Sequence, residues 1–245
     1  MGYLVERITS LAGLISYNKD WVKYLSYRFT GENDRPVTFR LRGGNHAITM
    51  PPQARFTLNE LFRDHVYDVQ GFDWSRCRYA LDLGANVGAF ALYVARRAPT
   101  AKIYCFEPEP DNFELLRRNV KLNALNAEIF PFAVADRCGD AALEMRESTS
   151  HRLGSSGVSV QCVDLAGVFR LTGVDHFDYS KIDIEGAEVG LLATATKDDL
   201  HKLGAVTIEW HDSEALSAGA ARLRAAGLSP LTEICGPDTY LKWGN

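Results

Sequence analysis

The residues best suited to chemistry form a turn after an apolar run. Residues 79–83 are mostly apolar and carry Asp82 near their end, and Gly84, Asn86 and Gly88 follow at alternate positions. In a parallel α/β sheet, ligands bind at the carboxyl ends of the strands, and glycines there let the backbone approach a ligand without an intervening Cβ. The spacing therefore predicts a strand, a ligand-binding turn and the start of a helix, with Asp82 beside the ligand.

A second polar position follows one βα unit later. Residues 102–106 have the pattern of a buried strand that ends in Glu107 and Pro108, and a helix with Asn112 in its first turn comes next. A carboxylate at this strand tip can accept hydrogen bonds from both hydroxyls of a ribose. Sites for dinucleotides and sites for S-adenosylmethionine share this combination of glycine turn and carboxylate.

The details of the turn favour S-adenosylmethionine. The turn lacks the G-x-G-x-x-G spacing that brings a helix N-terminus against a pyrophosphate, and Asn86 stands where that fingerprint has a glycine. Asp82 would repel a pyrophosphate, whereas it would attract the ammonium and sulfonium groups of S-adenosylmethionine. Ala133 and Val134, at the tip of the following strand, are predicted to form an uncharged wall against the adenine ring.

Candidate catalytic groups stand at the ends of two later strands. His211 follows the strand 205–210, and an imidazole has the basicity that a general base needs near neutral pH. Asp183 and Glu185 lie at the end of the strand 179–184, where alternation along an extended chain sends both to the same side. We expect Asp183 to face the sulfonium and Glu185 to bind or deprotonate the acceptor; a purely structural role for His211 stays open.

Other polar residues have weaker claims. His65 and Tyr67, just before the glycine turn, are candidates for acceptor binding. Glu188 is interpreted as stabilising the first turn of its own helix, where its charge complements the helix dipole. The carboxylates of Asp183, Glu185 and Glu188, together with His211 and Asp212, could instead hold Mg²⁺ or Ca²⁺, an alternative that we do not favour. The cysteines lack the paired spacing of a zinc site.

The elements that must position these residues alternate as in an α/β domain. The predicted elements are strands 79–83, 102–106, 127–132, 179–184 and 205–210, helices 90–98, 111–123, 188–195 and 214–226, and a closing strand pair at 229–234 and 239–243. Two extra strands, 141–145 and 158–163, flank a polar loop at 147–157. This loop is either a cover over the acceptor site or a solvated hairpin tip.

The N-terminal segment is predicted to be partly helical. Between Val5 and Phe29, apolar residues recur at helical spacing, which favours one or two helices. We favour packing of this stripe on the rest of the chain or on a second copy over membrane contact, because it is not strongly basic. Residues 37–42 and 46–50 predict a β-hairpin. The expected division is an N-terminal segment at 1–54 and a cofactor-binding domain at 55–245.

Composition excludes several classes of protein. The 245 residues carry a net charge of −4, which argues against general binding to nucleic acid phosphates, and 46% hydrophobic residues suit a single globular domain. No apolar run approaches the length of a membrane span, no secretory signal is evident, and the five scattered cysteines suit reduced thiols. We expect a cytoplasmic protein with a small-molecule or glycan acceptor, and a homo-oligomer through the N-terminal helices is an open alternative.

Three motifs together resemble the FkbM family of methyltransferases: LDLGANVG at 81–88, FEPEPDN at 106–112 and KIDIEGAE at 181–188. The resemblance covers most of the chain from about Leu58 onward, and residues 60–67 are similar to the stretch that precedes the cofactor turn in that family. It implies a class I, Rossmann-like fold with a mostly parallel sheet and an antiparallel C-terminal strand. It also implies S-adenosylmethionine-dependent methylation of a hydroxyl on a sugar or natural product, with no indication of which acceptor.

Two other functions stay open at this point. A nicotinamide-dependent oxidoreductase is disfavoured by the glycine spacing and by the lack of a recognisable tyrosine-lysine pair, and a cofactor-binding partner without catalysis would bind the cofactor but turn nothing over. The residues predicted to contact the cofactor are Asp82, Gly84, Ala85, Asn86, Gly88, Glu107, Pro108, Asn112, Ala133, Val134 and Asp183.

Overall fold

The centre of the molecule is a twisted seven-stranded sheet. The structure, a computed structural model, describes residues 11–27, 35–144, 152–154, 157–210, 213–234 and 239–244. The strand order is β12-β13-β11-β10-β3-β4-β5, and β13 runs antiparallel to both of its neighbours. The strands are β3 (Tyr79–Leu83), β4 (Lys102–Phe106), β5 (Ala127–Phe130), β10 (Tyr179–Ile182), β11 (Ala205–Trp210), β12 (Ser229–Ile234) and β13 (Thr239–Gly244). The predicted α/β class, with a mostly parallel sheet and an antiparallel C-terminal strand, is confirmed.

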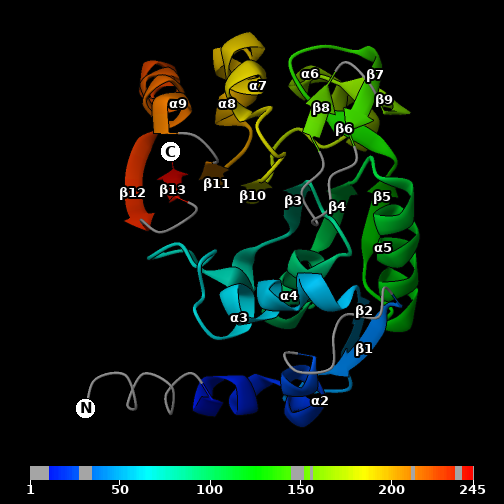
Figure 1. Ribbon diagram of the computed structural model, residues 1–245. Coiled ribbons are helices and arrows are strands. Elements are labelled where there is room, and N and C mark those ends of the chain that lie inside the picture. The colour runs from blue at the N-terminus through cyan, green and yellow to red at the C-terminus, as the bar shows by residue number, and fades with distance from the viewer. Residues whose placement is uncertain are drawn as a thin grey trace.

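Helices cover both faces of this sheet (Figure 1). One face carries α3 (Thr57–Phe62), α4 (Ala89–Arg97) and α5 (Pro110–Leu122), and the other carries α6 (Leu165–Thr172), α7 (Glu188–Thr194), α8 (Lys197–His201) and α9 (Ser213–Ala226). Separate apolar clusters fill the two faces, with Phe90 and Tyr93 in one and Leu191 and Leu223 in the other. The helices α6 and α8 were not among the predicted elements.

The predicted strand 127–132 is confirmed only for residues 127–130, because the chain changes sheet at Pro131. Proline has no backbone N–H to donate to a ladder, and β5 ends just before it. The next strand, β6 (Phe132–Val134), joins β7 (Gly139–Glu144), β8 (Arg152–Gly154) and β9 (Val158–Val163) in a second sheet of order β6-β9-β7-β8. Most of the predicted polar loop at 147–157 lies outside the described residues.

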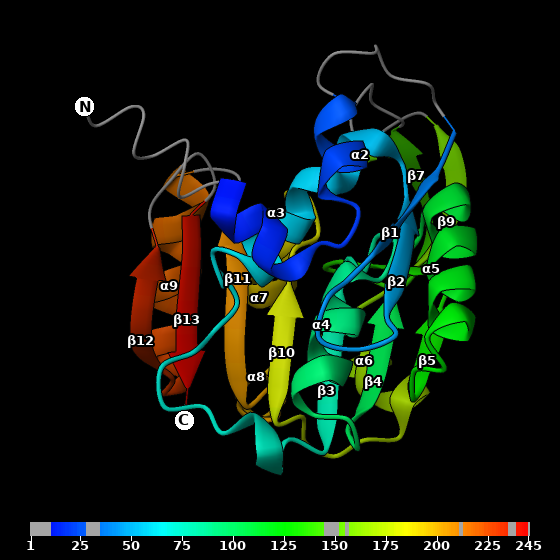
Figure 2. The ribbon, with the colours of Figure 1, turned by 90° about the horizontal axis from the view of Figure 1, so that it is seen from below.

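The N-terminal segment packs on the rest of the chain at the end of the sheet toward which β3 and β10 point (Figure 2). Residues 11–17 are helical, α2 spans Trp21–Ser26, and the predicted hairpin forms from β1 (Val37–Arg40) and β2 (Ala47–Met50). Leu14, Tyr17 and Tyr24 are buried in the cluster that also holds Phe90. The division at residue 54 stays a prediction.

Side-chain amides on α5 dock the hairpin. Asn119 accepts from the Thr49 amide at 2.8 Å and donates to the Thr49 carbonyl at 2.7 Å. Asn123 repeats the arrangement with the Ala47 amide and carbonyl at 2.9 and 2.7 Å. These amides satisfy backbone groups on the free edge of β2, as a neighbouring strand would. Two short polar side chains therefore fix how the N-terminal hairpin sits against the sheet.

Other features of the described part bear on the sequence predictions. No helix there combines the length and the apolar character needed to cross a membrane. Cys77, Cys105 and Cys162 are buried free thiols, and Cys138 is exposed. Burial raises the pKa of the Cys77 thiol to about 12, so this thiol stays protonated near neutral pH.

Candidate active site

The glycine turn after β3 has a backbone that few residues can adopt. Gly84, Asn86 and Gly88 have φ values of 78°, 48° and 86°, all in the left-handed region. A Cβ on Gly84 would lie 1.8 Å from the carbonyl oxygen of Asp183. The turn therefore lies directly against the chain that leaves β10. The requirement for glycine at position 84 comes from both the dihedral angle and this close approach.

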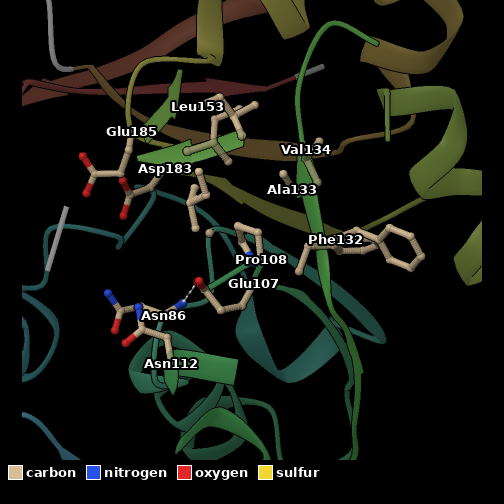
Figure 3. Close-up of a pocket in the computed structure, with 14 residues that line it drawn as sticks. Asn86, Glu107, Pro108, Asn112, Phe132, Ala133, Val134, Leu153, Asp183 and Glu185 are labelled. Atoms are coloured by element: carbon tan, nitrogen blue, oxygen red, sulfur yellow. Dashed lines mark hydrogen bonds between the residues drawn. The ribbon is translucent and has the colours of Figure 1, made fainter. Parts of the chain in front are cut away.

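A pocket with an empty volume of about 600 Å³ opens on one side of the turn. We call it the apolar lobe, and its lining residues are Gly84, Asn86, Phe106, Glu107, Pro108, Asn112, Phe132, Ala133, Val134, Leu143, Leu153, Asp183, Ile184 and Glu185. In Figure 3, Asp183 and Glu185 lie on one side of this lobe and Ala133 and Val134 on the other. The walls are mostly uncharged, as the adenine prediction requires.

Glu107 is the carboxylate at the base of the apolar lobe. It is 6% exposed, and its two oxygens accept from the Asn86 amide at 2.7 Å and the Glu109 amide at 2.9 Å. Figure 3 shows the first of these bonds. Burial raises the pKa of Glu107 to about 7, although both backbone amides oppose the shift. The side chain is therefore fixed in place and has acceptor capacity left on each oxygen.

Asn112, in the first turn of α5, faces the same lobe. Glu109 caps the helix by accepting from the Asp111 amide at 3.0 Å and the Asn112 amide at 2.5 Å. Glu109 is therefore the N-cap of α5. Asn112, 8% exposed, lines the lobe with its side chain.

A second pocket, with an empty volume of about 880 Å³, opens on the other side of the turn. We call it the polar lobe, and its lining residues are Met50, Ala54, Thr57, Glu60, Leu61, Tyr67, Gly84, Ala85, Asn86, Val87, Ala89, Phe90, Lys181, Asp183, Glu185 and Glu209. Four residues, Gly84, Asn86, Asp183 and Glu185, line both lobes. The two lobes therefore meet where the glycine turn faces the end of β10.

The loop after β10 carries the two predicted carboxylates. The strand ends at Ile182 rather than at Ile184 as predicted, because Glu185 turns back with a φ of 54°. Glu188 holds this loop by accepting from the Ile184 amide at 3.0 Å and the Gly186 amide at 3.2 Å. A non-glycine residue in this conformation is strained, and such strain is often retained at functional sites. Asp183 and Glu185 still lie side by side at the junction of the lobes (Figure 3).

A buried ion pair lies beneath this junction. Lys181 Nζ lies 3.3 Å from Asp82 Oδ1 and 3.1 Å from Asp183 Oδ2. Asp82 is fully buried and lines neither lobe, since its side chain faces Lys181. Burial lowers the pKa of Lys181, but the carboxylates of Asp183 and Asp82 outweigh that effect and raise it, so the ammonium stays charged.

The acceptor candidates separate in the structure. Tyr67 lines the polar lobe, where its hydroxyl donates to Glu209 Oε2 at 3.1 Å and its ring packs edge-on against Phe90. His65 lines neither lobe, and its Nδ1 lies 2.9 Å from Arg97 Nη2. His211 lies outside the described residues.

Most of the predicted cofactor residues line the apolar lobe. Gly84, Asn86, Glu107, Pro108, Asn112, Ala133, Val134 and Asp183 do so, whereas Ala85 lines the polar lobe alone. Gly88 lines neither, and it serves helix packing instead, because a Cβ there would lie 2.7 Å from Leu116 Cδ1.

Sequence reasoning missed several lining residues. It gave no role to Lys181 or Glu209, although both stand inside segments that it examined, and it left Leu153 in the polar loop. Alternation along β10 and β11 could have placed the first two near the site. Within the described ranges, no three His, Cys, Asp or Glu side chains are grouped so as to hold a metal ion.

Comparisons with known proteins agree with this architecture. A family model described as the methyltransferase FkbM domain matches residues 82–224. The chain is 28% identical to methyltransferase sdnD of Sordaria araneosa over 66% of this chain and 76% of that protein. It is 26% identical to the 31-O-demethyl-FK506 methyltransferase FkbM of Streptomyces tacrolimicus over 82% of this chain and 92% of that protein.

The solved structure of Aeropyrum pernix fibrillarin, with natively bound S-adenosyl-L-methionine, shares the fold. It aligns with a TM-score of 0.52 and 15% sequence identity over 88% of this chain and 83% of that chain. Of the functions that the sequence left open, the family match supports a methyltransferase over a nicotinamide-dependent oxidoreductase. The matched residues, 82–224, make up more than half of the chain and include the glycine turn, Glu107, the loop after β10 and the buried ion pair. The chain therefore belongs to the FkbM family of methyltransferases.

Proposed function

We propose that the protein is an S-adenosylmethionine-dependent O-methyltransferase whose acceptor hydroxyl belongs to a sugar or a natural product. The observation that carries this proposal is the pair of lobes that meet at Gly84 and Asp183, with Glu107 fixed at the base of one of them. A two-part site suits a reaction in which one ligand supplies a group and a second ligand receives it. The 26% identical relative whose name specifies a 31-O-demethyl substrate supports oxygen as the methylated atom.

The residues of the apolar lobe fit an adenosine group. A carboxylate held by two backbone amides can accept from two ribose hydroxyls, and Glu107 has that arrangement. Ala133, Val134 and Leu153 offer apolar surface for a planar ring. When bound there, S-adenosylmethionine supplies the electrophilic methyl group.

The residues at the junction of the lobes are suited to hold the acceptor and to accept its proton. The acceptor oxygen must be held in line with the methyl group and must lose its proton. We assign proton acceptance to Glu185, which lines both lobes and is held in a strained conformation, and orientation of the acceptor to Asp183. We assign binding of the acceptor to Tyr67 and Glu209, which line the polar lobe and are joined by a hydrogen bond.

Isothermal titration of the purified chain with S-adenosylmethionine and with S-adenosylhomocysteine tests the cofactor. We expect micromolar binding of both, unchanged by EDTA. A screen of sugar and natural-product acceptors by mass spectrometry then seeks addition of one methyl group. Binding of NAD(P) with no binding of either sulfur compound would overturn the proposal. Binding without turnover on any acceptor would favour the non-catalytic partner role.

A further inference from the structure

We propose that Lys181 is a positioning residue that clamps the glycine turn to the loop after β10 and so fixes the junction of the two lobes. This inference rests on the proposed function, because it concerns the turn assigned to the cofactor. None of the assignments above gives Lys181 a role in ligand binding. Its side chain is only 5% exposed, on the floor of the polar lobe.

The ammonium group of Lys181 has three partners from three segments. It donates to the Gly84 carbonyl at 2.9 Å and lies 3.1 Å from Asp183 Oδ2 and 3.3 Å from Asp82 Oδ1. The contact with Gly84 is a hydrogen bond, whereas the contact with Asp82 is an ion pair without one. One side chain from β10 thus connects the strand β3, the turn that follows it and the loop at its own end.

The Gly84 carbonyl needs such a donor because the rest of the turn is already fixed. The amides of Gly84 and Ala85 both donate to the Phe106 carbonyl, at 3.0 and 2.9 Å. The carbonyl of Gly84 lies on the side of Lys181, and the Cα of Gly84 lies against the Asp183 carbonyl. In the peptide bond between Gly84 and Ala85, the Ala85 amide is therefore bound by β4 and the Gly84 carbonyl is bound by Lys181.

Asp82 explains why the clamp carries a charge. Asp82 is fully buried, neither of its carboxylate oxygens has a hydrogen-bond partner among the described residues, and its charge is compensated by the ion pair with Lys181. Removing one member of a buried pair leaves an uncompensated charge, so a substitution of Lys181 alone would destabilise the fold for a reason unrelated to the turn. A test of the clamp must therefore remove both charges together.

The experiment compares Lys181→Met, Asp82→Asn and the double variant Asp82→Asn/Lys181→Met by thermal unfolding and by titration with S-adenosylhomocysteine. We expect Lys181→Met to lower the Tm strongly and the double variant to regain most of that loss. The double variant should nevertheless bind S-adenosylhomocysteine about tenfold more weakly than Asp82→Asn, since hydrogen bonds to charged groups have about that effect. Lys202→Met, which removes a lysine paired with Asp199 at 3.2 Å on α8, controls for loss of a lysine.

Equal affinity of the double variant and Asp82→Asn would overturn the clamp and leave Lys181 a purely structural counter-ion. Absence of S-adenosylhomocysteine binding to the wild-type chain would instead refute the proposed function, and the clamp with it. Should the double variant not fold, NMR of ¹⁵N-lysine-labelled wild-type protein decides. The buried ammonium signal is expected to shift on addition of S-adenosylhomocysteine, and an unmoved signal would refute the clamp.

Discussion

The two lobes differ in how the chain builds them. All but three of the residues that line the apolar lobe lie between Gly84 and Leu153, in the glycine turn, at the end of β4, on α5 and on β6, β7 and β8. The polar lobe combines residues near 50–67 with others at 84–90, 181–185 and 209. Its central hydrogen bond joins Tyr67 to Glu209, which are 142 positions apart in the sequence. A site made from neighbouring segments can be recognised as a motif, whereas a site made from distant segments depends on the whole fold.

The lobes also differ in what fixes their polar groups. In the apolar lobe, backbone amides hold the carboxylate of Glu107. In the polar lobe, side chains hold one another, as Lys181 does with Asp183 and Tyr67 with Glu209. Apart from Lys181, which contacts the glycine turn itself, substitutions in the polar lobe should therefore affect cofactor affinity less than substitutions in the apolar lobe.

The largest expected effect comes from Gly84→Ala, which disturbs both lobes at once. The new Cβ would lie 1.8 Å from the Asp183 carbonyl oxygen, so the backbone must move. We expect a loss of roughly 3 kcal/mol or more in the free energy of unfolding, measured by urea denaturation, because a clash with a fixed backbone atom is among the mechanisms that reach this size. Binding of S-adenosylhomocysteine should be lost in calorimetry.

Gly173→Ala is the matched control for this substitution. Gly173 also has a left-handed φ, 65°, but a Cβ there would meet nothing within 4 Å. It should cost only about 1 kcal/mol, the price of the dihedral angle. Equal losses in the two variants would show that the contact between the turn and β10 is unimportant.

A middle-sized effect is expected from Glu107→Ala. Because hydrogen bonds to a charged group contribute about 1.5–3 kcal/mol, affinity for S-adenosylhomocysteine should fall about 10- to 100-fold in calorimetry. Glu109→Ala serves as the comparison, since Glu109 caps α5 and does not line the lobe. It should lower the Tm with a smaller loss of affinity. A larger loss of affinity in Glu109→Ala than in Glu107→Ala would contradict the assignment of Glu107 to the ribose hydroxyls.

The pH dependence of ligand affinity in the wild-type protein also tests whether the Glu107 carboxylate binds the cofactor. The pKa of Glu107 is raised from 4.5 to about 7, so affinity for S-adenosylhomocysteine should rise between pH 6 and pH 8 as the carboxylate ionises. Stability of the ligand-free protein should follow the opposite trend. The contribution of Glu107 to folding is complete below about pH 4.5 and is lost as the pH rises through 7. An affinity independent of pH in this range would contradict the role of the carboxylate.

The smallest effect is expected from Tyr67→Phe in the polar lobe. It removes the 3.1 Å hydrogen bond to Glu209 and keeps the ring against Phe90. One such bond is worth about 1 kcal/mol, so the Tm should fall by roughly 2–4 °C in scanning calorimetry. Affinity for S-adenosylhomocysteine should change far less than in Glu107→Ala. A larger change would indicate that the cofactor extends across the junction into the polar lobe.

This contrast also explains how far the sequence could predict the molecule. Glu107 and the glycine turn were found because a strand, a turn and a helix follow one another within a few residues. Asp82 was expected beside the ligand, but alternation along β3 shows only that successive side chains face opposite sides, and its partner Lys181 lies on another strand. The split of the predicted third strand followed from Pro131, whose effect on the ladder the apolar pattern concealed.

The change of sheet at Pro131 has a consequence for cooperativity. The base of the apolar lobe is formed by Phe106, the last residue of β4 in the seven-stranded sheet, and by Glu107, which follows it; the opposite wall belongs to the other sheet through Val134, Leu143 and Leu153. The two sheets have separate hydrogen-bond ladders, so we expect one to open locally without the other. A ligand held between them would join two folding units into one, and amide exchange in β7 and β9 should then slow when the lobe is filled.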